Sequence, residues 1–147
     1  MALPTGSGTE TLHSHIFQDT DGSQTLIFGV QHHVYTVLSV VVFCNALNAI
    51  TDTFDIQMHG HDCHAGVSQA TTVVARANIQ VGETYVWNDK FSFNGVEPTG
   101  TNGLSAAEQI AIAAQANGSA LQELKFTVTN AADDYDLIVT YLDQDWT

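Results

Sequence analysis

Hydrophobic and polar residues alternate along much of the chain with a period of two, which is typical of β-strands that bury one face. The alternation is clear in residues 54–59, 73–81 and 124–128, and a further strand is predicted over residues 137–142. Residues 34–44 differ, because they are apolar at nearly every position and rich in β-branched side chains. That pattern predicts a strand that is buried on both faces.

An aromatic segment precedes the last two predicted strands. Tyr85, Trp87, Phe91 and Phe93 all have odd numbers, so they share one face of an extended chain. The opposite face carries polar residues such as Asn88. We therefore expect the aromatic face to lie in the core, with Trp87 and Phe91 largely buried.

One short helix is expected between the aromatic segment and the strand over residues 124–128. Residues 94–103 have the Gly, Pro, Thr and Asn content of a loop. Ser105 and Glu108 then form a capping box, apolar residues recur at helical spacing, and Gly118 follows as a C-cap. The pattern predicts an α-helix over about 105–116.

The order of these elements predicts the fold class. The strands follow one another with one helix and no βαβ repeat, which favours an antiparallel arrangement. Residues 1–23 are rich in Thr, Gly, Ser, His and Asp and predict an extended, irregular N-terminal arm, whereas residues 24–147 form the domain. The sequence thus predicts an all-β fold, an antiparallel β-sandwich or jelly-roll-like domain with one short helix.

The charge of the chain is one-sided and restricts its partners. The 147 residues include 16 Asp and Glu but three Lys and Arg, which gives a formal net charge of −13. Nucleic acids and anionic membranes are bound through basic side chains, so the composition argues against both partners. The longest apolar run, residues 37–44, is much shorter than a membrane-spanning helix of roughly 20 residues. Because the first residues lack the features of a signal peptide, we expect a chain that is not secreted, with Cys44 and Cys63 reduced.

The densest group of metal-ligating residues lies in residues 58–64. His59, His61, Cys63 and His64 are the candidate ligands, since Zn²⁺ is bound by imidazole and thiolate groups. Structural zinc sites usually take ligands from two chain segments, however, and these four residues share one loop. A polar surface or interface loop is therefore favoured, and a metal shared between subunits on a symmetry axis is the alternative.

The other polar groups do not indicate catalysis. Residues 19–23 partly match a Ca²⁺-binding loop, but their glycine spacing favours a turn. The acidic residues within 133–145 are expected to form a solvated turn and tail, and His13 and His15 to lie at the surface or an interface. The sequence contains no nucleophile elbow, phosphate loop, HExxH or dinucleotide motif. It therefore predicts no enzyme, no catalytic residues and no cofactor.

Three segments of the chain resemble a known group of proteins. These are residues 31–40, residues 45–48 and, above all, residues 81–91, which read VGETYVWNDKF. They are similar to segments of small β-sandwich virion structural proteins of marine tailed phages, cyanophages in particular. The resemblance covers about residues 24–147, and the chain departs from the group by its loop and helix over 99–118.

The resemblance implies a function that the residues alone do not give. It implies a non-enzymatic capsid decoration protein on the head exterior, made in the host cytoplasm and assembled into the virion. The expected partners are the major capsid protein or neighbouring virion proteins and further copies of the chain, with a trimer as the expected homo-oligomer. A neck or tail component, such as a connector, tail terminator or tail decoration subunit, is the alternative. A carbohydrate-binding module, suggested by Trp87, is the third interpretation.

Overall fold

The computed structural model describes residues 9–30, 32–62, 67–95 and 122–145, and all regular elements in these ranges are strands. They are β1 (Thr9–Thr20), β2 (Gln24–Phe28), β3 (His33–Ala46), β4 (Phe54–Asp62), β5 (Val67–Ala77), β6 (Thr84–Trp87), β7 (Phe91–Asn94), β8 (Glu123–Val128) and β9 (Asp134–Asp145). The predicted all-β class is confirmed, whereas the helix expected over about 105–116 lies outside the described residues. Within those ranges, no helix is long and apolar enough to cross a membrane.

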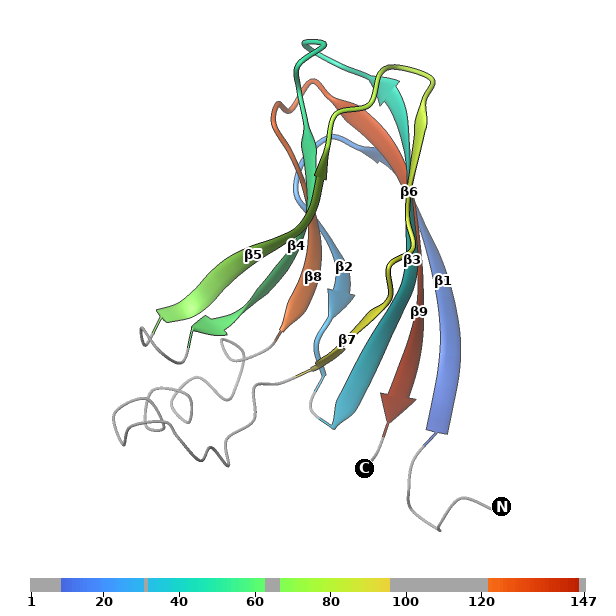
Figure 1. Ribbon diagram of the computed structural model, residues 1–147, viewed down its shortest axis with the longest axis vertical. Helices are drawn as coiled ribbons and strands as arrows, with labels where there is room; N and C mark the ends of the chain where they lie inside the picture. Colours follow the sequence, from blue (N-terminus) through green and yellow to red (C-terminus); the bar gives the residue numbers. More distant parts are fainter. Residues whose placement is uncertain (1–8, 31, 63–66, 96–121, 146–147) are drawn as a thin grey trace.

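The strands form two antiparallel sheets that face each other as a sandwich (Figure 1). Sheet A has the order β1-β9-β3-β6, and β7 pairs with the half of β3 that β6 leaves open. Sheet B has the order β2-β8-β4-β5. The sheets lie close together at one end and diverge toward the end at which β9 finishes (Figure 1).

Part of the expected N-terminal arm is a strand of sheet A. β1 pairs with β9 from Thr9 opposite Asp145 to Thr20 opposite Tyr135, so the described part of residues 1–23 is regular rather than irregular. The alternation of β1 does not mark it as a strand, because its inward positions carry polar side chains. Its place in the sheet depends on backbone pairing with the other end of the chain.

β3 does not have the two buried faces that its sequence predicts. Its register with β9 shifts by one residue after Val37, at a bulge. The core therefore receives Tyr35 and Val37 before the shift, but Val40 and Val42 after it. Phe43 points away from the core and is 37% exposed. The odd-numbered and the even-numbered positions of β3 are both largely apolar, partly because each set supplies core residues along half of the strand.

An aromatic cluster joins the sheets in the core. Phe54 of β4 is fully buried, and its ring centroid lies 5.4 Å from those of Phe126 in β8 and Tyr135 in β9. Trp87 is 9% exposed and contacts Phe91 edge-on, at 5.5 Å between centroids. The expected burial of Trp87 is confirmed, whereas Phe91 is only half-buried.

Candidate functional site

The predicted metal-ligand group is placed only in part. His59 lies in β4, where its Nε2 is 3.0 Å from Gln57 Oε1, and burial and nearby Lys125 lower its pKa. The backbone of His61 continues β4, but its side chain, Cys63 and His64 lie outside the described residues. Cys44 is buried and free, and burial raises the pKa of its thiol.

A different acidic cluster forms where the end of β1 meets the start of β9. Asp19, Asp134 and Asp136 offer carboxylate oxygens within 4.8 Å of one another, and in the described ranges no other group of three potential ligands is so close. Asp19 has a φ of 53°, and its backbone N–H donates to Asp136 Oδ1 at 3.0 Å. Oxygen groups of this kind are the ligands of hard divalent cations such as Ca²⁺. The sequence contains both acidic segments, but their meeting depends on the β1–β9 pairing.

The turn before β9 is not the solvated segment that its acidity predicts. Asp133 is fully buried and accepts hydrogen bonds from the backbone N–H groups of Asn48, at 2.8 Å, and Asn130, at 3.3 Å. Burial, together with the carboxyl of Asp52 beside it, raises the pKa of Asp133. The carboxyl thus fastens the loop after β3 to the turn before β9, a structural role.

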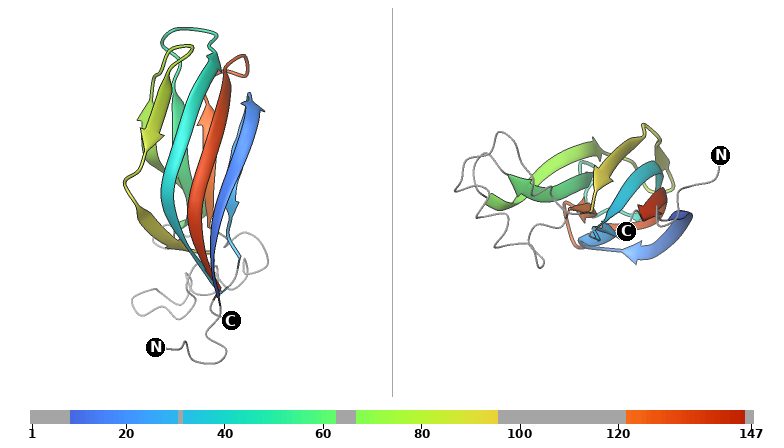
Figure 2. Two further views of the ribbon diagram at one scale, coloured as in Figure 1. Left: turned by 90° about the vertical axis from the view of Figure 1, so that its right-hand side faces the viewer. Right: turned by 90° about the horizontal axis from the view of Figure 1, so that it is seen from below.

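The outward surface of sheet A is uncharged over three neighbouring cross-strand rows. We call these rows the outer face of sheet A; Figure 2 (left) shows its strands side by side. The first row is Leu12, Leu142, Thr36 and Ser92, the second is Ser14, Thr140 and Ser39, and the third is Ile16, Ile138, Val41 and Val86. No row contains an Asp, Glu, Lys or Arg, although the chain has 16 acidic residues.

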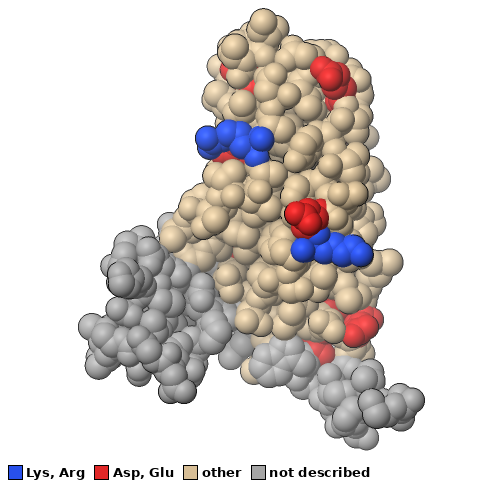
Figure 3. All heavy atoms as spheres, viewed as in Figure 1, with Lys and Arg blue, Asp and Glu red and all other residues tan. Residues whose placement is uncertain are grey.

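Several apolar side chains of this outer face are open to solvent. Leu12 is 65% exposed, Ile16 67%, Val86 55% and Ile138 38%. The third row crosses four strands, or about 15 Å of sheet at a strand spacing of about 4.8 Å. By contrast, the basic atoms visible in Figure 3 lie next to acidic ones. The outer face is therefore suited to protein contact by burial of apolar surface rather than by ion pairs.

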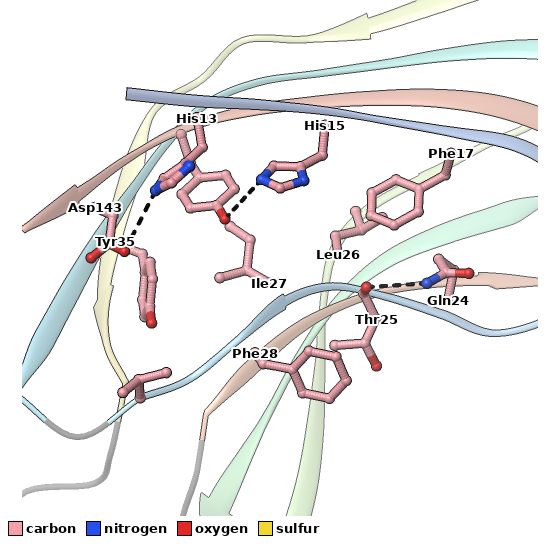
Figure 4. Close-up of a pocket in the computed structure, with 12 residues that line it drawn as sticks. His13, His15, Phe17, Gln24, Thr25, Leu26, Ile27, Phe28, Tyr35 and Asp143 are labelled. Carbon is pink, nitrogen blue, oxygen red and sulfur yellow. Dashed lines mark hydrogen bonds and ion pairs between the residues drawn. The ribbon is translucent and has the colours of Figure 1, made fainter. Parts of the chain in front are cut away.

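A cleft of about 450 Å³ opens between the edge strands β1 and β2 (Figure 4). On the sheet-A side of the cleft, Asp143 links two imidazoles. Its Oδ1 accepts a hydrogen bond from His33 Nδ1 at 2.7 Å, and its Oδ2 lies 3.7 Å from His13 Nε2. Burial and nearby Asp143 raise the pKa of Tyr35 to about 12, and the same causes raise that of Tyr141. Both phenols therefore stay protonated at neutral pH and can donate hydrogen bonds.

The cleft and Trp87 are separate features. Trp87 is buried in the core, so it offers no open aromatic surface to a sugar, and the sequence-based reason for a carbohydrate-binding module is wrong. Neither the cleft nor the outer face was predicted from the sequence. The signal for both was present in β1, whose even-numbered Leu12 and Ile16 and odd-numbered His13 and His15 separate two surfaces of different chemistry.

No family model and no curated protein sequence matches the chain. Among solved structures, it is similar to a Bacillus endospore appendage protein from a family of disulfide-linked pili, with 7% identity, a TM-score of 0.42, and coverage of 100% of this chain and 97% of the other. The CBM22-1-GH10 modules of a Clostridium thermocellum endo-1,4-beta-D-xylanase, in complex with xylohexaose, give 12% identity and a TM-score of 0.43, over 92% of this chain and 26% of that one. A chain of the T13 IBDV viral particle gives 10% identity and a TM-score of 0.39, over 96% of this chain and 36% of that one. At these identities the likenesses concern the fold, and they give no residue correspondence from which to transfer a function.

Proposed function

We propose that the chain is a non-enzymatic structural subunit of a virion, made in the host cytoplasm and placed on the head exterior of a tailed phage as a capsid decoration protein. The observation that carries this proposal is the outer face of sheet A, whose exposed apolar residues lie in rows without charge. Exposed apolar patches of this kind mark surfaces that another protein covers. The sequence resemblance indicates the kind of particle, and the outer face is the surface by which we propose that the protein attaches to it.

The chemistry of the outer face fits contacts among acidic copies. Interface cores are depleted in charged residues, and the three rows contain none. Because copies with a charge of −13 repel one another, a contact between them is favoured where carboxylates are absent. We therefore propose a homo-oligomer, with a trimer as the expected form because decoration subunits occupy symmetric positions on a shell. The major capsid protein or neighbouring virion proteins are the other proposed partners.

The segment first expected to be a separate arm takes part in this attachment. Leu12 and Ile16 of β1 supply the two most exposed apolar side chains of the outer face. Removal of residues 1–23 would take them away together with the edge strand. Truncated protein is therefore expected to fail to bind particles.

A neck or tail component, such as a connector, tail terminator or tail decoration subunit, is the alternative and would use the same outer face. Mass spectrometry of separated heads and tails distinguishes the two locations. We expect the chain to be recovered with the major capsid protein in the head fraction. Recovery with tails at a constant ratio to tail proteins would overturn the head assignment.

Dialysis of particles from high to low salt tests the mode of attachment. The Debye length is about 3 Å at 1 M salt and about 30 Å at 0.01 M, so low salt restores repulsion between acidic copies. We expect release of this protein, relative to the major capsid protein, to increase as salt is removed. Release that increases with added salt would show that ion pairs to a basic shell hold the protein.

A further inference from the structure

Strand β1 is a long edge strand of sheet A. It is the outermost strand beside β9 (Figure 2, left), and its register with β9 runs from Thr9 to Phe17 without a shift. Alternate residues of an edge strand direct their backbone N–H and C=O groups away from the sheet. Among the residues that the structure describes, no strand pairs with this side of β1. The free side of β1 can therefore accept another strand.

β1 lacks the features that usually protect an edge strand from pairing. Natural edge strands are protected by Lys, by Pro, by a bulge or by being short. Residues 9–17 contain neither Lys nor Pro, and no bulge interrupts them. By contrast, the edge strands β2, β6 and β7 have five, four and four residues, and register shifts interrupt the pairing of β5 with β4. Of the edge strands in the described ranges, β1 is thus the most open to strand addition.

The residues of β1 have a pattern that is the same in both directions. Residues 12–16 read Leu-His-Ser-His-Ile, with an apolar residue at each end and a serine at the centre. In a contact about a two-fold axis, if residue i lies opposite residue j, then j also lies opposite i. An axis at Ser14 therefore places Leu12 opposite Ile16 of a second copy, and Ser14 opposite Ser14 of that copy. An axis at His13 would instead place Leu12 opposite Ser14, which pairs an apolar residue with a polar one.

The axis at Ser14 covers the two most exposed apolar side chains of the outer face. Leu12 is 65% exposed and Ile16 67%. Residues directly opposite each other in an antiparallel pair have Cβ atoms about 4.5–5.5 Å apart, so their side chains are in contact. Each copy would thus bury Leu12 and Ile16 against the other, and the two outer faces would form one continuous surface.

The charge of β1 favours a second copy as the partner of this edge. Residues 11–17 contain no Asp or Glu, although the chain has a net charge of −13. With the axis at Ser14, Glu10 lies opposite the neutral Gln18 of the second copy rather than opposite another carboxylate. Two acidic copies can therefore approach each other here without direct repulsion between carboxylates.

We propose that β1 pairs in antiparallel orientation with β1 of a second copy, about a two-fold axis at Ser14, and so extends sheet A across both copies. A two-fold contact joins copies in pairs, so it is separate from the proposed trimer and would link one trimer to the next. One added strand pair is smaller than a typical stable interface, and the contact is therefore expected at high protein concentration. The inference adds a contact to the proposed self-association and does not depend on the virion role.

Oxidative crosslinking of Ser14→Cys in a Cys63→Ser background tests the pairing, because a disulfide traps a weak contact. Cys44, which remains, is buried. Directly opposite residues have Cα atoms about 4.5–5.5 Å apart, within the range of about 4.4–6.8 Å in which disulfides form. Ser92→Cys is the matched control, since Ser92 is also an exposed serine of the outer face but lies in β7, at the other edge of sheet A. At millimolar protein concentration, we expect Ser14→Cys to give at least about tenfold more linked dimer than Ser92→Cys.

A mixture of Leu12→Cys with isotopically labelled Ile16→Cys tests the position of the axis. Because Leu12 lies opposite Ile16 of the second copy, mass spectrometry should find mainly linked dimers that contain one copy of each variant. Dimers formed mainly by Leu12→Cys with itself would overturn the axis at Ser14. No more linked dimer from Ser14→Cys than from Ser92→Cys would overturn the edge contact. Neither result changes the proposed location of the chain in the particle, which the head and tail fractions test.

Discussion

Replacement of Trp87 by alanine tests which face of the aromatic segment lies in the core. Trp87 is 9% exposed, lies opposite Val40 in β3 and packs edge-on against Phe91. Its truncation removes an indole from between the two sheets. Because the neighbouring strands are hydrogen-bonded on sheet A, we expect them to close the resulting cavity only in part.

The expected loss is large for a single substitution. Truncation of a buried Phe or Trp to alanine typically costs about 3 to 5 kcal/mol, from lost burial and from the cavity left behind. For a domain of this size, that loss lowers the Tm by about 10 to 15 °C. Urea denaturation followed by circular dichroism gives the free energy directly, and an unchanged m-value would show that the unfolded state is not altered.

Val86→Ala is the control, since Val86 is the chain neighbour of Trp87 but points outward and is 55% exposed. We expect it to change the free energy of unfolding by less than about 0.5 kcal/mol. A loss below about 1 kcal/mol for Trp87→Ala would show that the indole does not fill the core. A larger loss for Val86→Ala than for Trp87→Ala would show that the strand faces the other way.

Three further predictions concern buried polar groups. Arg76 donates to both carboxylate oxygens of Asp55 and lowers the pKa of that carboxyl group. The interaction therefore stabilises the fold above the unfolded pKa of about 3.8, and this contribution is lost as pH falls through the lowered folded pKa. Arg76→Met should therefore lower the urea midpoint at pH 7, with the two proteins converging in acid, and an equal midpoint at pH 7 would contradict this. The raised pKa of Asp133 has the opposite sign, because its ionisation costs stability as pH rises above the unfolded value of about 3.8. Asn keeps an oxygen for only one of the two backbone N–H groups that bond to Asp133, so Asp133→Asn should lower the urea midpoint, but by less at pH 7 than below pH 3.8, and a difference in midpoint that does not change with pH would contradict this. Buried Cys44, in a Cys63→Ser background, should react with a thiol reagent only in urea, and rapid reaction of the native protein would show that the site is open.

The part of the fold that could be predicted from the sequence is the part with local signals. The alternation over residues 54–59 and 124–128 gave β4 and β8, since each has one face in the core. β3 was predicted as a strand but with the wrong burial, because the bulge after Val37 is set by pairing with β9, and a run that is apolar at nearly every position does not show where the inward face changes. β1 was missed for a related reason, since its inward histidines conceal its partly buried face.

The candidate sites depend on contacts between distant parts of the chain. Asp19 and Asp136 are 117 residues apart and meet only because β1 pairs with β9. The uncharged row of Ile16, Ile138 and Val41 likewise needs the registers of three strands. Composition indicated an acidic protein without catalytic motifs, but which surface lacks the charge is a property of the sheet.

Sedimentation velocity on Ile16→Asp/Val86→Asp tests most directly whether the outer face of sheet A joins copies of the chain. Ile50→Asp/Val81→Asp is the matched control, because it adds the same charge at residues that are 75% and 58% exposed but lie outside the three rows. In 0.5 M salt, we expect an oligomer, with a trimer as the expected form, for the wild type and the control, and a monomer for Ile16→Asp/Val86→Asp. An oligomer that survives both substitutions, or a wild-type protein that remains monomeric at high micromolar concentration, would contradict it.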